Sequence, residues 1–215
     1  MKTIQILTGG FVCPYQLGVC MYIKTHYNLN NVKFIGGGGG SWLSIYMASD
    51  MPNKIITRAF MPKLKHRFET APLHTKWQTI GIFLKNEIPR YIKSTEFVDN
   101  KQITVSLSKF DECKLKTEMT ENYGTLDGLL HLCYLSSFLS GIDIPVYRNN
   151  KFIYVPFTTK DTSTIDLCVY PSMWGRRFKL EEYTGCDFAN KLLMDGYTDT
   201  MNNSEFIDNK LDKDP

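Results

Sequence analysis

The chain has 215 residues, a formal net charge of +3, 43% hydrophobic residues and 22% charged residues. This composition is typical of one globular domain with a sizeable core, and the charge is too small to indicate a nucleic-acid partner. No apolar run reaches the roughly 18 residues of a transmembrane helix, and the N-terminus lacks the long apolar core of a signal peptide. We therefore expect an intracellular protein, either cytoplasmic or peripheral to a membrane.

Two units of strand, glycine turn and helix open the chain. Residues 3–7 predict a strand, which is followed by a glycine pair and a helix over residues 15–27. Residues 32–35 predict a second strand, which is followed by five consecutive glycines at 36–40 and a helix to about residue 49. This order predicts an α/β fold with parallel strands, in which both glycine turns lie at the carboxyl edge of the sheet. Two helix N-termini facing one crevice would suit an anion or an oxyanion.

The middle of the chain, from about residue 51 to residue 95, is expected to be helical and rich in loops. It is locally basic, which favours a solvated helical face; the alternative is a surface for anionic lipid headgroups. The basic residues are Lys54, Arg58, Lys63, Lys65, His66 and Arg67.

Further strands are predicted at residues 103–110, 152–157 and 165–170, and further helices at residues 126–139 and 187–201. The sequence turns polar and acidic after about residue 202, where the chain is expected to fray. We therefore expect one domain over residues 1–201 and a polar, partly disordered tail over residues 202–215.

The cysteines and histidines do not indicate a metal site. The six cysteines are scattered and form no CxxC pair, which is typical of free, buried thiols in a reducing compartment. The four histidines share no metal-ligand spacing with one another or with the cysteines. We expect no metal and no cofactor.

The ordered motifs resemble those of the patatin-like phospholipases, including the adiponutrin-type members. That family opens with a strand, a glycine-rich oxyanion loop and a helix containing Y-x-x-G-V; here residues 7–11 read L-T-G-G-F and residues 15–19 read Y-Q-L-G-V. A G-x-S-x-G nucleophile elbow follows in the family, and here residues 36–40 are all glycine. The serine-rich residues 135–139 and the G-Y-T-D at residues 196–199 are similar to later family motifs.

This resemblance implies a three-layer α/β/α sandwich with a mostly parallel central sheet. It also implies a lipid acyl hydrolase with a Ser-Asp dyad, in which the elbow serine attacks an ester carbonyl and an Asp in a D-G-G or D-G-A turn activates it. The oxyanion loop would be Gly9, Gly10 and Phe11, and the elbow would be Gly36, Gly38 and Gly40.

The sequence departs from the family pattern at three places. Gly38 occupies the serine position, and glycine has no side chain that could form an acyl-enzyme. The Asp turn is missing: in one register Pro156 replaces the Asp, and in another the turn has been deleted. The oxyanion loop is one residue short, and Pro14, which has no N–H to donate, lies where glycine is usual.

Four residues could replace the missing dyad. Ser41 lies about one helical turn past Gly38, but a serine at a helix start commonly bonds to the backbone. Asp127 and Asp195 both precede glycine, and both fit structural positions in helices better than a catalytic turn. Cys13 lies near the oxyanion loop, with no histidine close in the sequence.

The loss of both dyad members favours a catalytically inactive protein that keeps the scaffold. Such a protein could bind lipid or acyl chains at a membrane surface, or bind a protein partner. The first alternative is an active serine lipid acyl hydrolase of phospholipase A2 type that uses Ser41. The second is a structural component of an assembly such as a viral particle, which the abundant Tyr (12) and Phe (13) would suit.

Overall fold

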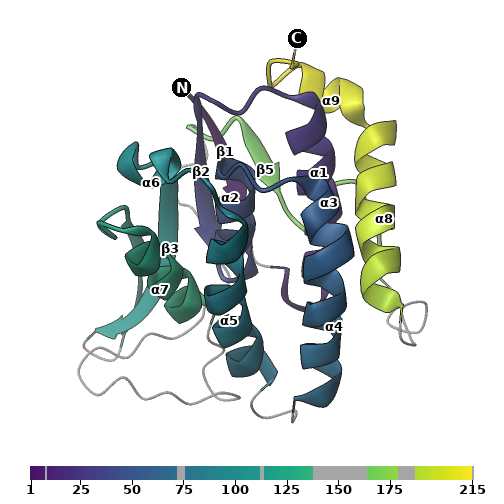
Figure 1. The fold of residues 1–215 in the computed structure, drawn as a ribbon. Helices are drawn as coiled ribbons and strands as arrows, with labels where there is room; N and C mark the ends of the chain where they lie inside the picture. The colour runs from purple at the N-terminus through teal and green to yellow at the C-terminus, as the bar shows by residue number, and fades with distance from the viewer. Residues whose placement is uncertain (8, 72–75, 112–113, 138–163, 179–186, 215) are drawn as a thin grey trace.

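A computed structural model describes residues 1–214, except residue 8 and residues 72–75, 112–113, 138–163 and 179–186. The described strands form one five-stranded sheet in the order β4-β3-β2-β1-β5 (Figure 1). Their bounds are β1 (Lys2–Ile6), β2 (Val32–Gly37), β3 (Ile103–Asp111), β4 (Lys114–Thr120) and β5 (Leu167–Val169). The α/β class is confirmed.

The sheet is mixed rather than wholly parallel. Strand β1 pairs with β2 and with β5 in parallel, and β2 pairs with β3 in parallel. Strand β4 pairs with β3 in the antiparallel sense and forms one edge. The sequence analysis does not anticipate β4, whose K-L-K-T-E-M-T pattern is short, alternating and charged, as protected edge strands often are. The strand predicted at residues 152–157 lies outside the described residues.

The helices that connect the first strands follow the prediction closely. Helix α1 (Cys13–His26) joins β1 to β2, and α2 (Gly39–Ala48) follows β2. The segment between α2 and β3 contains α3 (Asn53–Ile55), a π-helical turn (Ile56–Phe60), α4 (Met61–Thr70), α5 (Lys76–Glu87), a 3-10 turn (Ile88–Tyr91) and α6 (Glu96–Asp99). We call residues 53–91 the helical insertion.

The later helices are α7 (Leu126–Ser136), α8 (Phe188–Asn202) and α9 (Ser204–Asp208). Helix α2 lies against strands β1 to β3, α7 lies against β3 and α2, and α8 runs beside α1 (Figure 1). The described residues thus place α2 and α7 together over the sheet. A patatin-like sandwich with helices on both faces is not confirmed.

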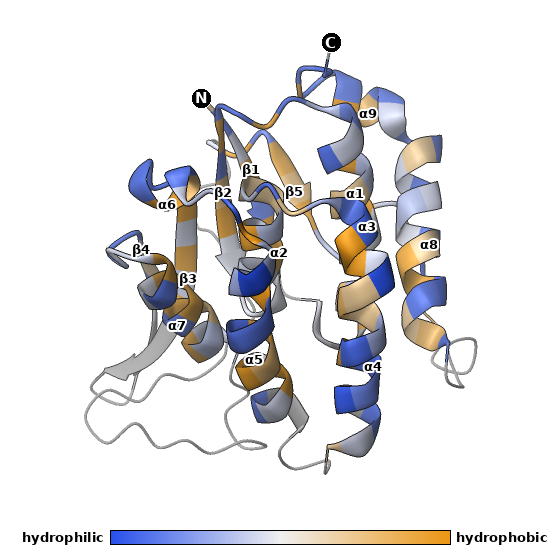
Figure 2. Cartoon of the chain, in the orientation of Figure 1, coloured by the Kyte–Doolittle hydropathy of each residue, from blue (hydrophilic) through white to orange (hydrophobic). Residues whose placement is uncertain are grey.

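The core lies between the sheet and these helices. The strands present large, fully buried side chains, among them Ile4, Phe34 and Ile103. Figure 2 shows the consequence, with hydrophobic residues concentrated on the strands and hydrophilic residues on much of α4. Within the described part of the chain, no helix is long and apolar enough to cross a membrane.

The polar C-terminal segment, for which composition suggests fraying, packs against the body of the molecule. Ile207 of α9 and Leu211 are buried. Beyond them the Asn28 N–H donates to Asp212 O at 2.9 Å, and the Asp214 N–H donates to His26 O at 3.1 Å. Two buried aliphatic side chains and these backbone bonds attach the segment, although its overall composition is polar.

Candidate functional site

The turn between β2 and α2 is sharp and depends on glycine. Gly38 has φ +58° and ψ −127°, a backbone conformation that residues other than glycine rarely adopt. Its N–H donates to Ser136 Oγ at 2.8 Å, and Ser136 Oγ in turn donates to Ser106 O at 2.7 Å. Strand, turn and helix therefore form an elbow at the place where the sequence analysis expects one.

The flanking glycines are required by close packing. A Cβ at Gly40 would lie 2.1 Å from Ile6 O, so α2 could not lie as close to β1 with any other residue there. A Cβ at Gly36 would lie 2.5 Å from Ser41 Cα, inside the elbow itself. These two positions explain why small residues flank such a turn.

Ser41 is turned away from any substrate. The residue is fully buried, and its Oγ donates to Gly38 O at 2.7 Å. This is the local backbone bond expected of a serine at a helix start. The hydroxyl therefore stabilises the elbow and is not exposed to an incoming ester.

The glycine loop after β1 lies next to the elbow. Gly10 has φ +50° and begins a 3-10 turn (Gly10–Val12) that leads directly into α1. At the start of α1, Cys13 Sγ would lie 3.2 Å from a Cβ built on Gly39, so the N-termini of α1 and α2 are neighbours. The structure thus brings together the two glycine turns that the sequence analysis places at one sheet edge.

Cys13 is unsuited to act as a nucleophile. Burial raises the pKa of its thiol to about 12. Because the thiolate is the reactive form, a thiol with this pKa is almost wholly unreactive at neutral pH.

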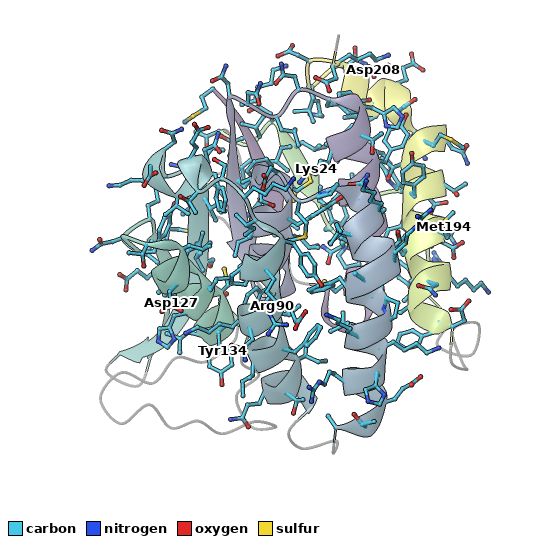
Figure 3. All side chains as sticks on the ribbon, viewed as in Figure 1. Lys24, Arg90, Asp127, Tyr134, Met194 and Asp208 are labelled. Atoms are coloured by element: carbon cyan, nitrogen blue, oxygen red, sulfur yellow. The ribbon has the colours of Figure 1, made fainter. Side chains whose placement is uncertain are left out.

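The two D-G aspartates lie apart from the elbow. Asp127 is in the first turn of α7, where its exposed carboxylate lies 3.4 Å from Lys85 Nζ (Figure 3). Asp195 lies on α8, 3.2 Å from Arg176 Nη1. Neither lines the cavity described below. Pro156, the degenerate Asp position, is outside the described residues.

An apolar cavity of about 270 Å³ opens beside the elbow. One face of α2 lines it with residues at helical spacing: Gly39, Trp42, Leu43 and Tyr46. The N-terminal part of α1 and its loop contribute Gly10, Cys13, Pro14 and Leu17. The helical insertion supplies the opposite wall: Ile56, Phe60, Met61, Leu64, Lys65, Glu69, Ile80, Gly81, Leu84 and Ile88.

The few polar groups on the cavity wall are mostly occupied or lie at one end. Ser137 Oγ accepts from Trp42 Nε1 at 2.7 Å and donates to Cys133 O at 2.8 Å. Lys65 and Glu69, one turn apart on α4, are the charged residues among the described lining residues. The cavity is therefore apolar with two charged residues on one wall, a composition common in small-molecule sites.

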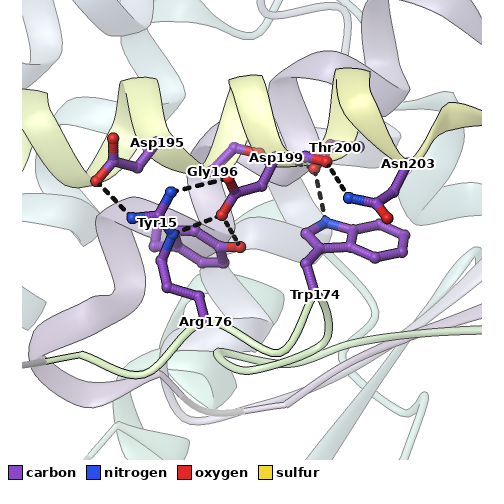
Figure 4. A network of polar contacts seen from close by, with 8 residues as sticks. All are labelled: Tyr15, Trp174, Arg176, Asp195, Gly196, Asp199, Thr200 and Asn203. Carbon is purple, nitrogen blue, oxygen red and sulfur yellow. Dashed lines mark hydrogen bonds and ion pairs between the residues drawn. The ribbon is translucent and has the colours of Figure 1, made fainter.

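A second cluster holds the loop after β5 against α8 and α1 (Figure 4). Arg176 makes two hydrogen bonds to Asp199, Nε to Oδ2 at 2.5 Å and Nη2 to Oδ1 at 2.8 Å. The Tyr15 hydroxyl donates to Asp199 Oδ2 at 2.8 Å. The arginine lowers the pKa of the Asp199 carboxyl, and the tyrosine bond adds to this effect. We call Tyr15, Arg176 and Asp199 the latch.

Two motifs that carry the family resemblance meet at this cluster. A Cβ at Gly18 would lie 2.0 Å from Leu193 O, and one at Gly196 would lie 2.0 Å from Tyr15 O. The Y-x-x-G-V and G-Y-x-D residues are therefore explained by close packing of α1 against α8. Sequence reasoning identified these residues but missed Arg176 and the latch.

The cavity wall formed by the helical insertion was also missed. Its signal was present in the sequence, since Met61, Leu64 and Lys65 share one helical face with Glu69. The basic residues of this segment favoured a solvated surface instead. Four of them are indeed exposed: Arg58, Lys63, His66 and Arg67. Comparison of the chain with protein-family models, curated proteins and solved structures finds no match.

Proposed function

We propose that this chain is a catalytically inactive protein of patatin-like, three-layer fold that binds a lipid acyl chain. The observation that carries the proposal is the apolar cavity, which begins at the two glycine turns where a patatin-like enzyme would hold its ester. The elbow is formed around Gly38, which supplies no nucleophile. The Ser41 hydroxyl is buried and bonded to Gly38 O.

The position of α4 supports a lipid ligand further. One side of this helix lines the cavity with Met61, Leu64 and Lys65, while the cation Arg67 on its other side is exposed. Exposed cations attract a protein to anionic lipid, by about 1 kcal/mol for each residue near the surface. The same helix would then face the membrane and border the cavity that receives the acyl chain.

A fluorescent fatty-acid titration tests the binding proposal. We expect saturable binding to the wild type and its loss in Leu64→Asp, because this change puts a carboxylate into the apolar wall. Met194→Asp is the matched control, since Met194 is 58% exposed on the outer side of α8 (Figure 3) and does not line the cavity. Absence of saturable binding to the wild type would refute the proposal.

A serine-reactive fluorophosphonate probe tests whether the protein is inactive. We expect no labelling of the folded wild type, alongside a labelled active patatin-like enzyme as the positive control. Labelling that disappears in Ser41→Ala would instead support an acyl hydrolase that uses Ser41, and the inactive assignment would be wrong.

A further inference from the structure

The cavity has two chemically different ends. At the elbow end lie the N-termini of α1 and α2, represented by Cys13 and Gly39, and the C-terminal half of α4 with Glu69; Lys65 lies one turn before Glu69, at the middle of that helix. Helix α4 runs in the opposite direction to α2 and α5 in Figure 1. The other end is therefore formed by the C-terminal part of α2 and the start of α4, with Tyr46, Met51, Ile56, Phe60 and Ile88.

The far end is bordered by the π-helical turn, Ile56–Phe60. This turn places Ile56 and Phe60 on the same cavity wall, and both side chains are more than nine-tenths buried. Short π-helical segments inside α-helices occur frequently at functional sites. Here the irregular turn places an aromatic ring in the wall at this end of the cavity.

Phe60 separates the cavity from the core behind it. Its ring packs against that of Phe83, with a centroid distance of 5.4 Å, and Phe83 is buried but does not line the cavity. A smaller side chain at position 60 would therefore extend the cavity toward Phe83. A larger one would shorten it.

The dimensions favour one chain rather than two. The cavity volume of about 270 Å³ lies just below the usual range for drug-sized ligands, about 300–1,000 Å³. The lining face of α2 from Gly39 to Tyr46 covers about 10 Å at the helical rise per residue. A diacyl lipid would need room for a second chain, whereas a single acyl chain fills a narrow apolar space of this kind.

We infer that the cavity takes one unbranched acyl chain with its methyl end toward the π-helical turn, and that Phe60 sets the longest chain it accepts. The carboxylate or other anionic head then lies toward the elbow end, beside Lys65 at the middle of α4. This inference rests on the proposed function and adds the ligand class, its orientation and the residue that limits its length.

The test is a displacement titration with saturated fatty acids of increasing length. Each further buried methylene tightens binding by about fourfold, so wild-type affinity should rise with length and then level off. We expect Phe60→Ala to move this limit to longer chains and Phe60→Trp to move it to shorter ones. Phe60→Trp keeps the core filled and so covers the case in which Phe60→Ala does not fold.

Ile82→Ala is the matched control, because Ile82 is 46% exposed on α5 and does not line the cavity. Its length profile should equal that of the wild type. An unchanged limit in both Phe60 variants, with the wild type still binding, would overturn the length assignment and leave the proposed function standing. If the wild type bound no fatty acid of any length, both would be wrong.

Orientation is tested with Lys65→Met. The change should weaken fatty-acid binding by up to about fivefold, the range of an exposed ion pair, and should leave binding of the matching methyl ester unchanged. Arg67→Met, at an exposed position of the same helix, controls for the overall loss of charge. Equal effects of Lys65→Met on acid and ester would show that the head does not lie beside Lys65.

Discussion

At the scale of single residues, the elbow keeps its shape because its central residue is glycine. A side chain at φ +58° would add strain, and active enzymes with a serine elbow accept that strain for the sake of an exposed nucleophile. Gly38 has no side chain to place, so the sharp turn costs little. The turn then serves to position α2, whose face lines the cavity.

Substitution at this position should destabilise the protein. We expect Gly38→Ala to lower the free energy of unfolding by about 1–3 kcal/mol, the usual cost of an unfavourable backbone conformation. Urea denaturation followed by circular dichroism measures this change. Gly38→Ser should lose a similar amount, because the cost comes from the backbone; wild-type stability in both variants would show that the turn is not strained.

At the scale of elements, α1 and α8 approach closely because each has a glycine at the crossing. We expect Gly18→Ala and Gly196→Ala each to destabilise the protein by about 1–3 kcal/mol, because each new Cβ would meet a backbone oxygen of the opposite helix. Met194→Ala, at an exposed position of α8, should change the stability by less than about 0.5 kcal/mol.

A variant that carries both Gly18→Ala and Gly196→Ala tests whether the two glycines act at the same helix contact. Once the first alanine has separated the helices, the second should cost less, so the combined loss should be smaller than the two single losses added. Chemical denaturation of all four proteins gives this coupling. If the two losses of stability were strictly additive, Gly18 and Gly196 would not act at one shared contact between α1 and α8.

The latch joins three elements and should make stability depend on acid pH. Arg176 holds the pKa of the Asp199 carboxyl below its value of 3.8 in the unfolded chain. The unfolded state therefore binds more protons in this range, so the stabilisation is fully present above about pH 5 and is lost as the pH falls through the lowered pKa.

Replacement of the arginine should remove this dependence. We expect Arg176→Met to lower the free energy of unfolding at pH 7 by about 1–3 kcal/mol, since Asp199 then loses its charged partner. The difference from the wild type should shrink as the pH falls below about 5 and through the lowered pKa of Asp199. Urea titrations across that range measure it, and a difference independent of pH would refute the electrostatic role of the latch.

At the scale of the whole molecule, local patterns predicted local structure well. The strand–glycine–helix units at residues 3–49 were identified because apolar periodicity and glycine runs act within a few residues. The joining of the two glycine turns followed from parallel pairing of β1 and β2. The antiparallel edge strand β4 was missed because its charged alternation gives only a weak strand signal.

The cavity was harder to predict because it depends on long-range packing. Its walls come from α1, α2 and the helical insertion, and no window of sequence contains all three. Lys65 was interpreted as part of a solvated or membrane-facing surface, although it lies on the inner side of α4. Arg176 was missed for the same reason, since its partners lie on α8 and α1.

Because the cavity lies between α2 and the helical insertion, a bound chain should tie these parts together. At a hundredfold excess over the dissociation constant, ligand binding stabilises the folded state by about 2.7 kcal/mol. We expect a fatty acid to raise the melting temperature and to slow amide hydrogen exchange in α4 and α5 more than in α9, which does not border the cavity. Leu64→Asp should show neither change. Protection spread equally over α9 would mean that the ligand acts elsewhere, because occupancy of this cavity directly fixes only the helices that line it.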